Sequence, residues 1–117
     1  MNFDFSKGRI TLIVAPVDMR YGYRRLSLLA RALLDLDVDG GKEFVVFASK
    51  SRSVAKMIWA DGRGTNILSR RLHQGRFERF LAKINGPATL EASAEELTQF
   101  LDGRPLFAVR SRICSAD

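Results

Sequence analysis

Residues 55–77, AKMIWADGRGTNILSRRLHQGRF, decide the fold of this chain, because they have the pattern of a β-hairpin followed by a cationic segment. Two strand-like runs, Ala55–Trp59 and Asn66–Leu72, flank the sequence DGRG at 61–64. Glycine reaches positive φ at little cost, and a glycine followed by one other residue suits the two-residue turn of many hairpins. The stretch therefore predicts a hairpin in the middle of the chain.

The turn leaves two registers open for this hairpin. A loop made of Gly62 and Arg63 places Met57 opposite Leu68, with an apolar face that also holds the tryptophan at 59. A three-residue loop with a bulge at Gly64 shifts the pairing by one residue and redistributes the charges between the two faces.

Length and composition indicate one globular domain covering residues 1–117. Hydrophobic residues make up 46% and charged residues 27% of the sequence, which are ordinary values for a folded domain. Cys114 is the one cysteine, so no internal disulfide or cysteine zinc cluster is possible. No apolar run approaches the roughly 20 residues of a membrane span, and the N-terminus does not resemble a secretory signal. We therefore expect a cytoplasmic protein without membrane contact.

Positive charge is concentrated in the middle of the chain. The protein has 19 lysines and arginines against 13 acids, a net charge of +6. Residues 42–83 hold ten of those bases and three of the acids, whereas the segments on either side are close to neutral. Arginine predominates, and its guanidinium forks to phosphate and stacks on bases. This favours a surface that binds a polyanion, although a generic basic surface or a carboxylate-rich protein partner fits as well.

The first half of the chain predicts a strand, a helix and a second strand. Ile10–Val14 is apolar and rich in β-branched residues, and Phe44–Phe47 is apolar on both sides, as in a central strand. Between them, apolar residues recur at three- and four-residue steps as far as Leu34, so we expect an amphipathic helix of about five turns. Asp18 suits its N-cap, and Gly22 inside it suggests a close packing contact.

The second half adds the hairpin and a short helix. Glu78–Ile84 is a possible short helix or extended turn, and Leu106–Val109 is a possible final edge strand. Ser93 and Glu96 have the spacing of a capping box at the start of a helix. The resulting order is β-α-β-β-β-α, an α+β domain with helices against a mostly antiparallel sheet.

Four stretches resemble one family in the right order. Residues 16–23, PVDMRYGY, are similar to a P-x-D-M-R-x-G-aromatic signature, and residues 56–64, KMIWADGRG, to a K-x-x-W-x-D-G-x-G hairpin. Residues 71–77 and 90–103 are similar to an R-L-x-x-G-R-F motif and a C-terminal helix. Over about residues 10–104, the chain thus resembles TnpB, the accessory protein encoded by the second reading frame of insertion sequence 66 elements. The motif positions are Asp18, Met19, Arg20, Gly22, Trp59, Asp61, Gly62, Gly64, Leu72, Gly75 and Phe77.

The resemblance implies an accessory role in transposition beside a separate transposase, with DNA and that transposase as the expected partners. We expect a non-enzymatic protein that binds DNA non-specifically by neutralising phosphates. The alternative is an interaction module that docks on the transposase or another acidic partner without touching DNA. The predicted nucleic-acid contacts are Lys50, Arg52, Lys56, Arg63, Arg70, Arg71, Arg76 and Arg79.

Catalytic and metal roles have weaker support, and we expect neither a catalytic residue nor a cofactor or metal. A metal-dependent nuclease needs three converging acids. The candidates are Asp18, Asp61 and one of Glu91, Glu95 and Glu96, and each has a cap, turn or helix-terminal role that explains it. The acidic loop with aspartates at 35, 37 and 39 lacks the later spacing of a calcium loop. Met19 and Trp59 are expected in the core, His73 at a turn or surface, and Arg20 in an ion pair or hydrogen bond within the chain.

Overall fold

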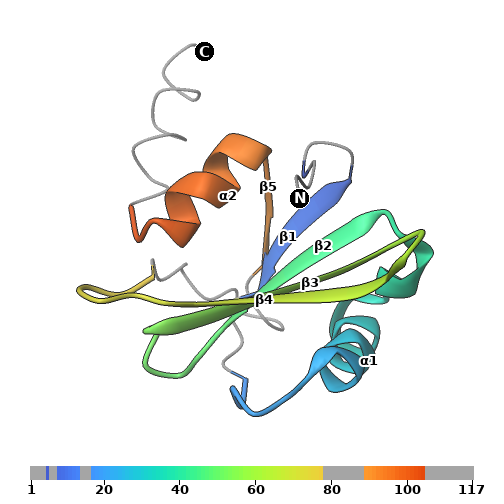
Figure 1. The fold of residues 1–117 in the computed structure, drawn as a ribbon, viewed down its shortest axis with the longest axis horizontal. Coiled ribbons are helices and arrows are strands. Elements are labelled where there is room, and N and C mark those ends of the chain that lie inside the picture. The colour runs from blue at the N-terminus through green and yellow to red at the C-terminus, as the bar shows by residue number, and fades with distance from the viewer. Residues whose placement is uncertain (1–4, 6–7, 14–16, 78–88, 105–117) are drawn as a thin grey trace.

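A computed structural model describes residue 5 and residues 8–13, 17–77 and 89–104 of the chain. Five strands and two α-helices make up this part of the protein (Figure 1). In chain order the elements are β1 (Arg9–Ile13), α1 (Tyr23–Leu34), the short 3-10 helix η2 (Val38–Gly40), β2 (Glu43–Ala48), β3 (Val54–Asp61), β4 (Gly64–Arg71), β5 (Thr89–Ala92) and α2 (Ala94–Leu101).

The strands form one sheet in the order β4-β3-β2-β1-β5. Only β1 and β2 pair in parallel, across the α1 connection, and the other neighbours are antiparallel. The predicted α+β class with a mostly antiparallel sheet is therefore confirmed, and the Phe44–Phe47 run lies in the middle strand. The predicted order lacked one strand, because β5 is only four residues long and is held by pairing with β1.

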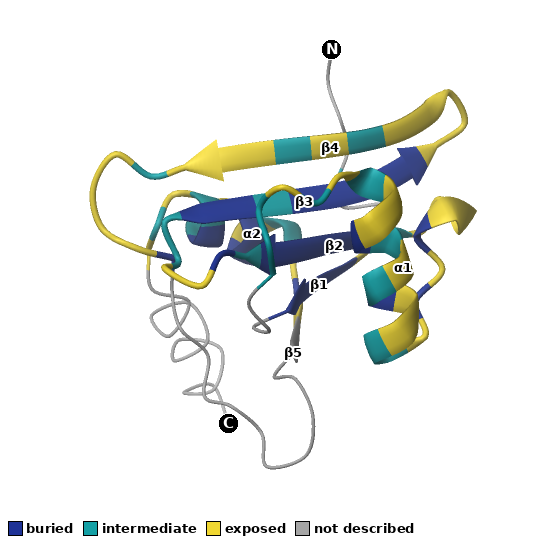
Figure 2. Cartoon of the chain, turned by 90° about the horizontal axis from the view of Figure 1, so that it is seen from below, coloured by how far each residue is buried: buried dark blue, intermediate teal, exposed yellow. Residues whose placement is uncertain are grey.

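The hairpin is confirmed, and of the two registers that the sequence left open the structure has the one with the two-residue loop. Met57 pairs with Leu68 and Trp59 with Asn66, and Asp61 closes the turn opposite Gly64. The strand β4 forms one edge of the sheet, and Figure 2 shows that it is mostly exposed whereas β2 and β3 are buried. The hairpin thus presents a long outer strand supported by a buried inner one.

Each face of the sheet has its own apolar cluster, and α1 and α2 cover opposite faces (Figure 1). On the α1 face, Leu26 and Ala30 of the helix pack against side chains such as Ile58. On the α2 face, Leu97 and Phe100 pack against a cluster of strand residues. That cluster contains Ile10, Leu12, Phe44, Val46, Ala55, Met57 and Trp59. Alternation along the strands divides the apolar side chains between these two faces.

The start of α1 corrects the sequence prediction. The helix begins at Tyr23 with Gly22 as its N-cap, so Asp18 does not cap it and it has 12 residues. Instead, Asp18 accepts from the backbone N–H of Arg20 at 2.8 Å, and a separate turn forms between Asp18 and Tyr21. The predicted close contact at Gly22 is also wrong, because a Cβ there would meet nothing within 4 Å.

The C-terminal helix follows its prediction. Ser93 accepts from the N–H of Glu96, and the Glu96 carboxylate accepts from the N–H of Ser93, both at 3.1 Å. This is the expected capping box at the start of α2. The possible helix at Glu78–Ile84 and the possible strand at Leu106–Val109 lie outside the described residues.

Candidate nucleic-acid interface

Four of the eight predicted phosphate contacts lie beside the join between the β2–β3 loop and the segment after β4. Lys50 and Arg52 belong to that loop, Arg71 ends β4 next to Val54, and Arg76 follows in the segment. Together with Arg70, these residues form what we call the basic end: Lys50, Arg52, Arg70, Arg71 and Arg76.

Backbone contacts hold the basic end together. The Nη1 atom of Arg76 donates to the carbonyl oxygen of Ser51 at 2.5 Å. The N–H of Phe77 donates to the carbonyl oxygen of Arg52 at 2.8 Å, and the N–H of Leu72 donates to that of Ser53 at 3.0 Å. Two segments about 25 residues apart in sequence are thus fixed side by side, next to the point where β3 begins and β4 ends.

Phe77 anchors this arrangement in the core. Its side chain is fully buried, and its ring stacks on that of Phe100 in α2, with centroids 5.1 Å apart. The family-like R-L-x-x-G-R-F motif therefore combines two functions. Arg71 and Arg76 supply charge, Gly75 supplies a positive φ of 77°, and Leu72 and Phe77 bind the segment to the apolar cluster on the α2 face.

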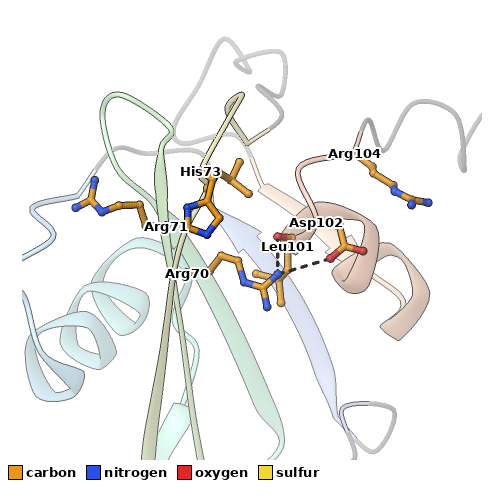
Figure 3. A pocket seen from close by; sticks show the side chains of 7 residues that line it. Arg70, Arg71, His73, Leu101, Asp102 and Arg104 are labelled. Carbon is orange, nitrogen blue, oxygen red and sulfur yellow. Dashed lines mark hydrogen bonds and ion pairs between the residues drawn. The ribbon is translucent and has the colours of Figure 1, made fainter.

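Arg70 points to the α2 face, where the structure provides an internal partner. Its Nη1 atom donates to the carbonyl oxygen of Leu101 at 3.2 Å and lies 3.6 Å from Oδ1 of Asp102. A surface hollow of about 410 Å³ lies beside this contact (Figure 3). Its lining also includes His73, which is exposed, and Arg104, a cation that sequence reasoning missed because it lies beyond α2.

The remaining predicted contacts are dispersed. Arg63 lies in the hairpin turn at the opposite end of β4, which at about 3.3 Å per residue is roughly 20–25 Å from Arg71. The Nζ atom of Lys56 donates to the carbonyl oxygens of Met19 and Tyr21 before α1, the latter at 3.1 Å. Arg79 lies outside the described residues.

The P-x-D-M-R motif forms a fork between neighbouring charges. The Arg20 guanidinium donates from Nε and Nη2 to the Asp18 carboxylate, with the Nη2–Oδ2 distance at 2.6 Å. These side-chain hydrogen bonds, and then the backbone N–H of Arg20, lower the pKa of Asp18 to about 2. The expected internal partner of Arg20 is therefore Asp18. The motif forms the turn whose carbonyl oxygens, those of Met19 and Tyr21, accept hydrogen bonds from the Lys56 ammonium.

The K-x-x-W-x-D-G-x-G motif builds the hairpin. Trp59 is buried, as expected, and its ring meets that of Phe5 edge-on at 5.4 Å. The Asp61 carboxylate accepts from the N–H groups of Arg63 and Gly64 at 2.8 and 3.1 Å and from the side-chain amide of Asn66 at 3.1 Å. The backbone N–H of Arg63 is the first of several donors that lower the pKa of Asp61. Asp61 is thus a turn-stabilising residue.

Within the described ranges, no three histidine, cysteine, aspartate or glutamate side chains come together as a metal site would require. In the acidic loop, Asp35 and Asp37 face Arg31, with their closest oxygens 3.2 and 3.6 Å from the guanidinium, and Asp39 accepts from the hydroxyl of Tyr23 at 2.6 Å. The acids that a nuclease would need are engaged in local turns and a helix cap.

No helix in the described part of the chain is both long and apolar enough to cross a bilayer. A curated relative, the uncharacterized protein y4hO of Sinorhizobium fredii (strain NBRC 101917 / NGR234), is 38% identical over 69 residues, which span 59% of this chain and 59% of that protein. No solved structure matches the chain. The family model for the IS66 Orf2 like protein matches residues 8–111, which include all four motif stretches. Because this match covers most of the sequence, the chain belongs to the IS66 Orf2-like protein family.

Proposed function

We propose that this protein is a non-enzymatic accessory protein of insertion-sequence transposition that binds DNA through its basic end. Membership in the IS66 Orf2-like family supports the accessory role in transposition. The observation that carries the DNA contact is the joining of the β2–β3 loop to the segment after β4. The Arg76–Ser51 and Phe77–Arg52 hydrogen bonds collect cations that are far apart in sequence.

The geometry favours phosphate contacts. Lys50, Arg71 and Arg76 are exposed, so their charged groups reach solvent without a desolvation cost. Arg52 and Arg76 each use one guanidinium nitrogen on a backbone carbonyl, which fixes the group and leaves further donors for a phosphate oxygen. Phosphate contacts position a protein on DNA without reading the sequence, so we expect weak sequence preference.

Docking on an acidic surface of the transposase is the second candidate. The exposed Arg104 supports it, because this arginine lines a hollow beside the Arg70–Asp102 ion pair, where it would meet a carboxylate of a partner. Arg70, His73 and Arg104 line the adjacent hollow, which has room for an acidic side chain. This candidate needs no phosphate and no nucleic acid.

Fluorescence anisotropy with labelled random and element-end duplexes tests the proposal. Four or so phosphate contacts predict a linear fall in log K with log salt with a slope near −4, since each contact contributes about −0.9. Similar affinities for both duplexes are expected. Absence of binding at about 50 mM salt would contradict DNA binding, and pull-down of the element's transposase under the same conditions would support the second candidate.

A further inference from the structure

The strand β4 is an outer strand of the sheet that the described residues form. It is eight residues long and contains no proline, and within the described part of the chain no strand pairs with its outer side. Long open edges normally carry a proline, a bulge, charged side chains or a covering element, because their unpaired N–H and C=O groups template pairing with another strand, and β4 has charges only at its C-terminal end. The pairing with β3 runs without a bulge from Val54 opposite Arg71 to Asp61 opposite Gly64. The hydrogen-bonding pattern of this edge is therefore regular along the whole strand.

The register identifies which backbone groups face outward. The N–H of Leu72 donates to the carbonyl oxygen of Ser53, so residues of even number in β4 bond to β3. The two-residue turn gives the same pattern, because the residues that flank it, Asp61 and Gly64, form a hydrogen-bonded pair. The outward groups then belong to every second residue of the strand, which are Thr65, Ile67, Ser69 and Arg71.

We propose that a second copy of this chain pairs with β4 in antiparallel orientation, with the two-fold axis at Leu68. In this register Thr65 faces Arg71 of the other copy, and Ile67 faces its Ser69. All four outward residues of each strand are paired, giving about eight backbone hydrogen bonds. The two sheets then join into one continuous sheet across the seam, and no other register pairs all four.

The charges disfavour the neighbouring register. The basic C-terminal end of β4 meets the hairpin end of the other copy, where Asp39 and Asp61 lie with Arg24 and Arg63. On the α1 face, Arg71 is placed beside Thr65, which lines a hollow of about 420 Å³ with Asp39, although Arg24 lines it too. On the α2 face, Arg70 is placed opposite Asn66, whose amide contacts Asp61. A two-fold axis at Ile67 would instead set Arg71 against Arg63.

The seam also brings the exposed Ile67 side chains of the two copies close together. Among the described residues, Leu28 and Ile67 are the large hydrophobic side chains with high exposure, at 58% and 45%. Ile67 lies on the α1 face of β4, and Leu28 lines the same hollow as Thr65. In the paired form the Ile67 side chains of the two copies become diagonal neighbours across the seam. The pairing therefore removes part of the exposed apolar surface of Ile67 from water.

Sedimentation of the full chain with a proline variant tests the proposal. Ser69→Pro removes an outward N–H and leaves the even-numbered bonds to β3 in place, whereas Ser69→Ala keeps that N–H. We expect sedimentation to show a concentration-dependent dimer for the wild type and for Ser69→Ala, and a monomer for Ser69→Pro. Circular dichroism should show that the Ser69→Pro monomer is folded. A monomeric wild type, or a Ser69→Pro variant that still dimerises, would overturn the proposal.

Cysteine cross-linking in a Cys114→Ser background tests the register independently. Leu68→Cys places two thiols in a pair that is not hydrogen-bonded, with Cα atoms about 4.5 Å apart, which suits a disulfide. Thr65→Cys lies on the same edge but six positions from its own copy, roughly 20 Å away. We expect oxidation to link Leu68→Cys dimers at least tenfold faster than Thr65→Cys. Equal rates would overturn the register.

Discussion

Arg70 and Arg71 are consecutive in β4, yet their side chains leave the strand on opposite faces of the sheet (Figure 3). Arg70 reaches α2, where it meets the Leu101 carbonyl and Asp102. Arg71 points to the α1 face, where it lies beside Val54 at the start of β3. A pair of adjacent arginines therefore does not form one cationic surface here, and the basic end depends on the contacts that bring other segments to it.

Changing Lys56 to methionine is expected to affect stability, whereas changing Lys50 to methionine is expected to affect DNA binding. The Lys56 ammonium holds two carbonyl oxygens before α1, so Lys56→Met should lower the free energy of unfolding by about 1–3 kcal/mol. Its DNA affinity should change little. Lys50 is exposed, so Lys50→Met should keep stability and weaken DNA binding. Urea unfolding measures the free energy of unfolding of each variant, and fluorescence anisotropy measures its DNA affinity. A flattened salt slope in Lys56→Met would show that its charge contacts DNA after all.

The Asp18–Arg20 fork predicts a pH dependence at low pH. The pKa of Asp18 is lowered from 3.8 to about 2, so the folded state favours the carboxylate. The stabilising contribution is therefore complete above the ordinary pKa and is lost as the pH falls from 3.8 toward 2. An NMR titration of the Asp18 carboxyl measures this directly. Arg20→Gln should return the pKa toward its usual value, and an unchanged pKa in that variant would mean that another group lowers it.

A change at Phe77 is expected both to destabilise the core and to loosen the β2–β3 loop of the basic end. Phe77→Leu removes the ring that stacks on Phe100 and leaves part of a fully buried site empty, which should cost on the order of 1–3 kcal/mol. Because the Phe77 N–H binds the Arg52 carbonyl, the variant should also speed amide exchange in the β2–β3 loop. Thermal unfolding and hydrogen exchange test the two effects. Ile58→Val, which also removes buried volume but belongs to the cluster on the α1 face, controls for general loosening.

The hairpin could be predicted from the sequence because its turn and its alternation are local, although two registers stayed open. The two-residue loop of Gly62 and Arg63 fixes the register of the whole β3–β4 ladder, including Met57 opposite Leu68. The capping box at Ser93 is likewise a three-residue relationship. These features depend on neighbours in sequence, and the structure agrees with each of them.

The predictions that were wrong or missing concern features that depend on long-range contacts or on a choice between similar local structures. The strand β5 exists through pairing with β1 and has too little pattern of its own. Asp18 suits a helix cap and an isolated turn equally well, and the choice is decided by Arg20 and by the Lys56 ammonium from β3. The alternation of side chains along a strand could have predicted that Arg70 and Arg71 lie on opposite faces of the sheet. No local signal joins Arg76 to Ser51.

Salt-dependent anisotropy on two charge-matched double variants tests DNA binding by the basic end most directly. One is Arg52→Asn with Arg76→Gln, where asparagine tolerates the positive φ of 60° at position 52. The other is Arg9→Gln with Arg31→Gln, which removes the same charge from β1 and from the last turn of α1, away from the basic end. The account predicts that the first variant flattens the salt slope by about two units and the second leaves it near the wild-type value. Equal slopes in the two variants would contradict a DNA contact at the basic end.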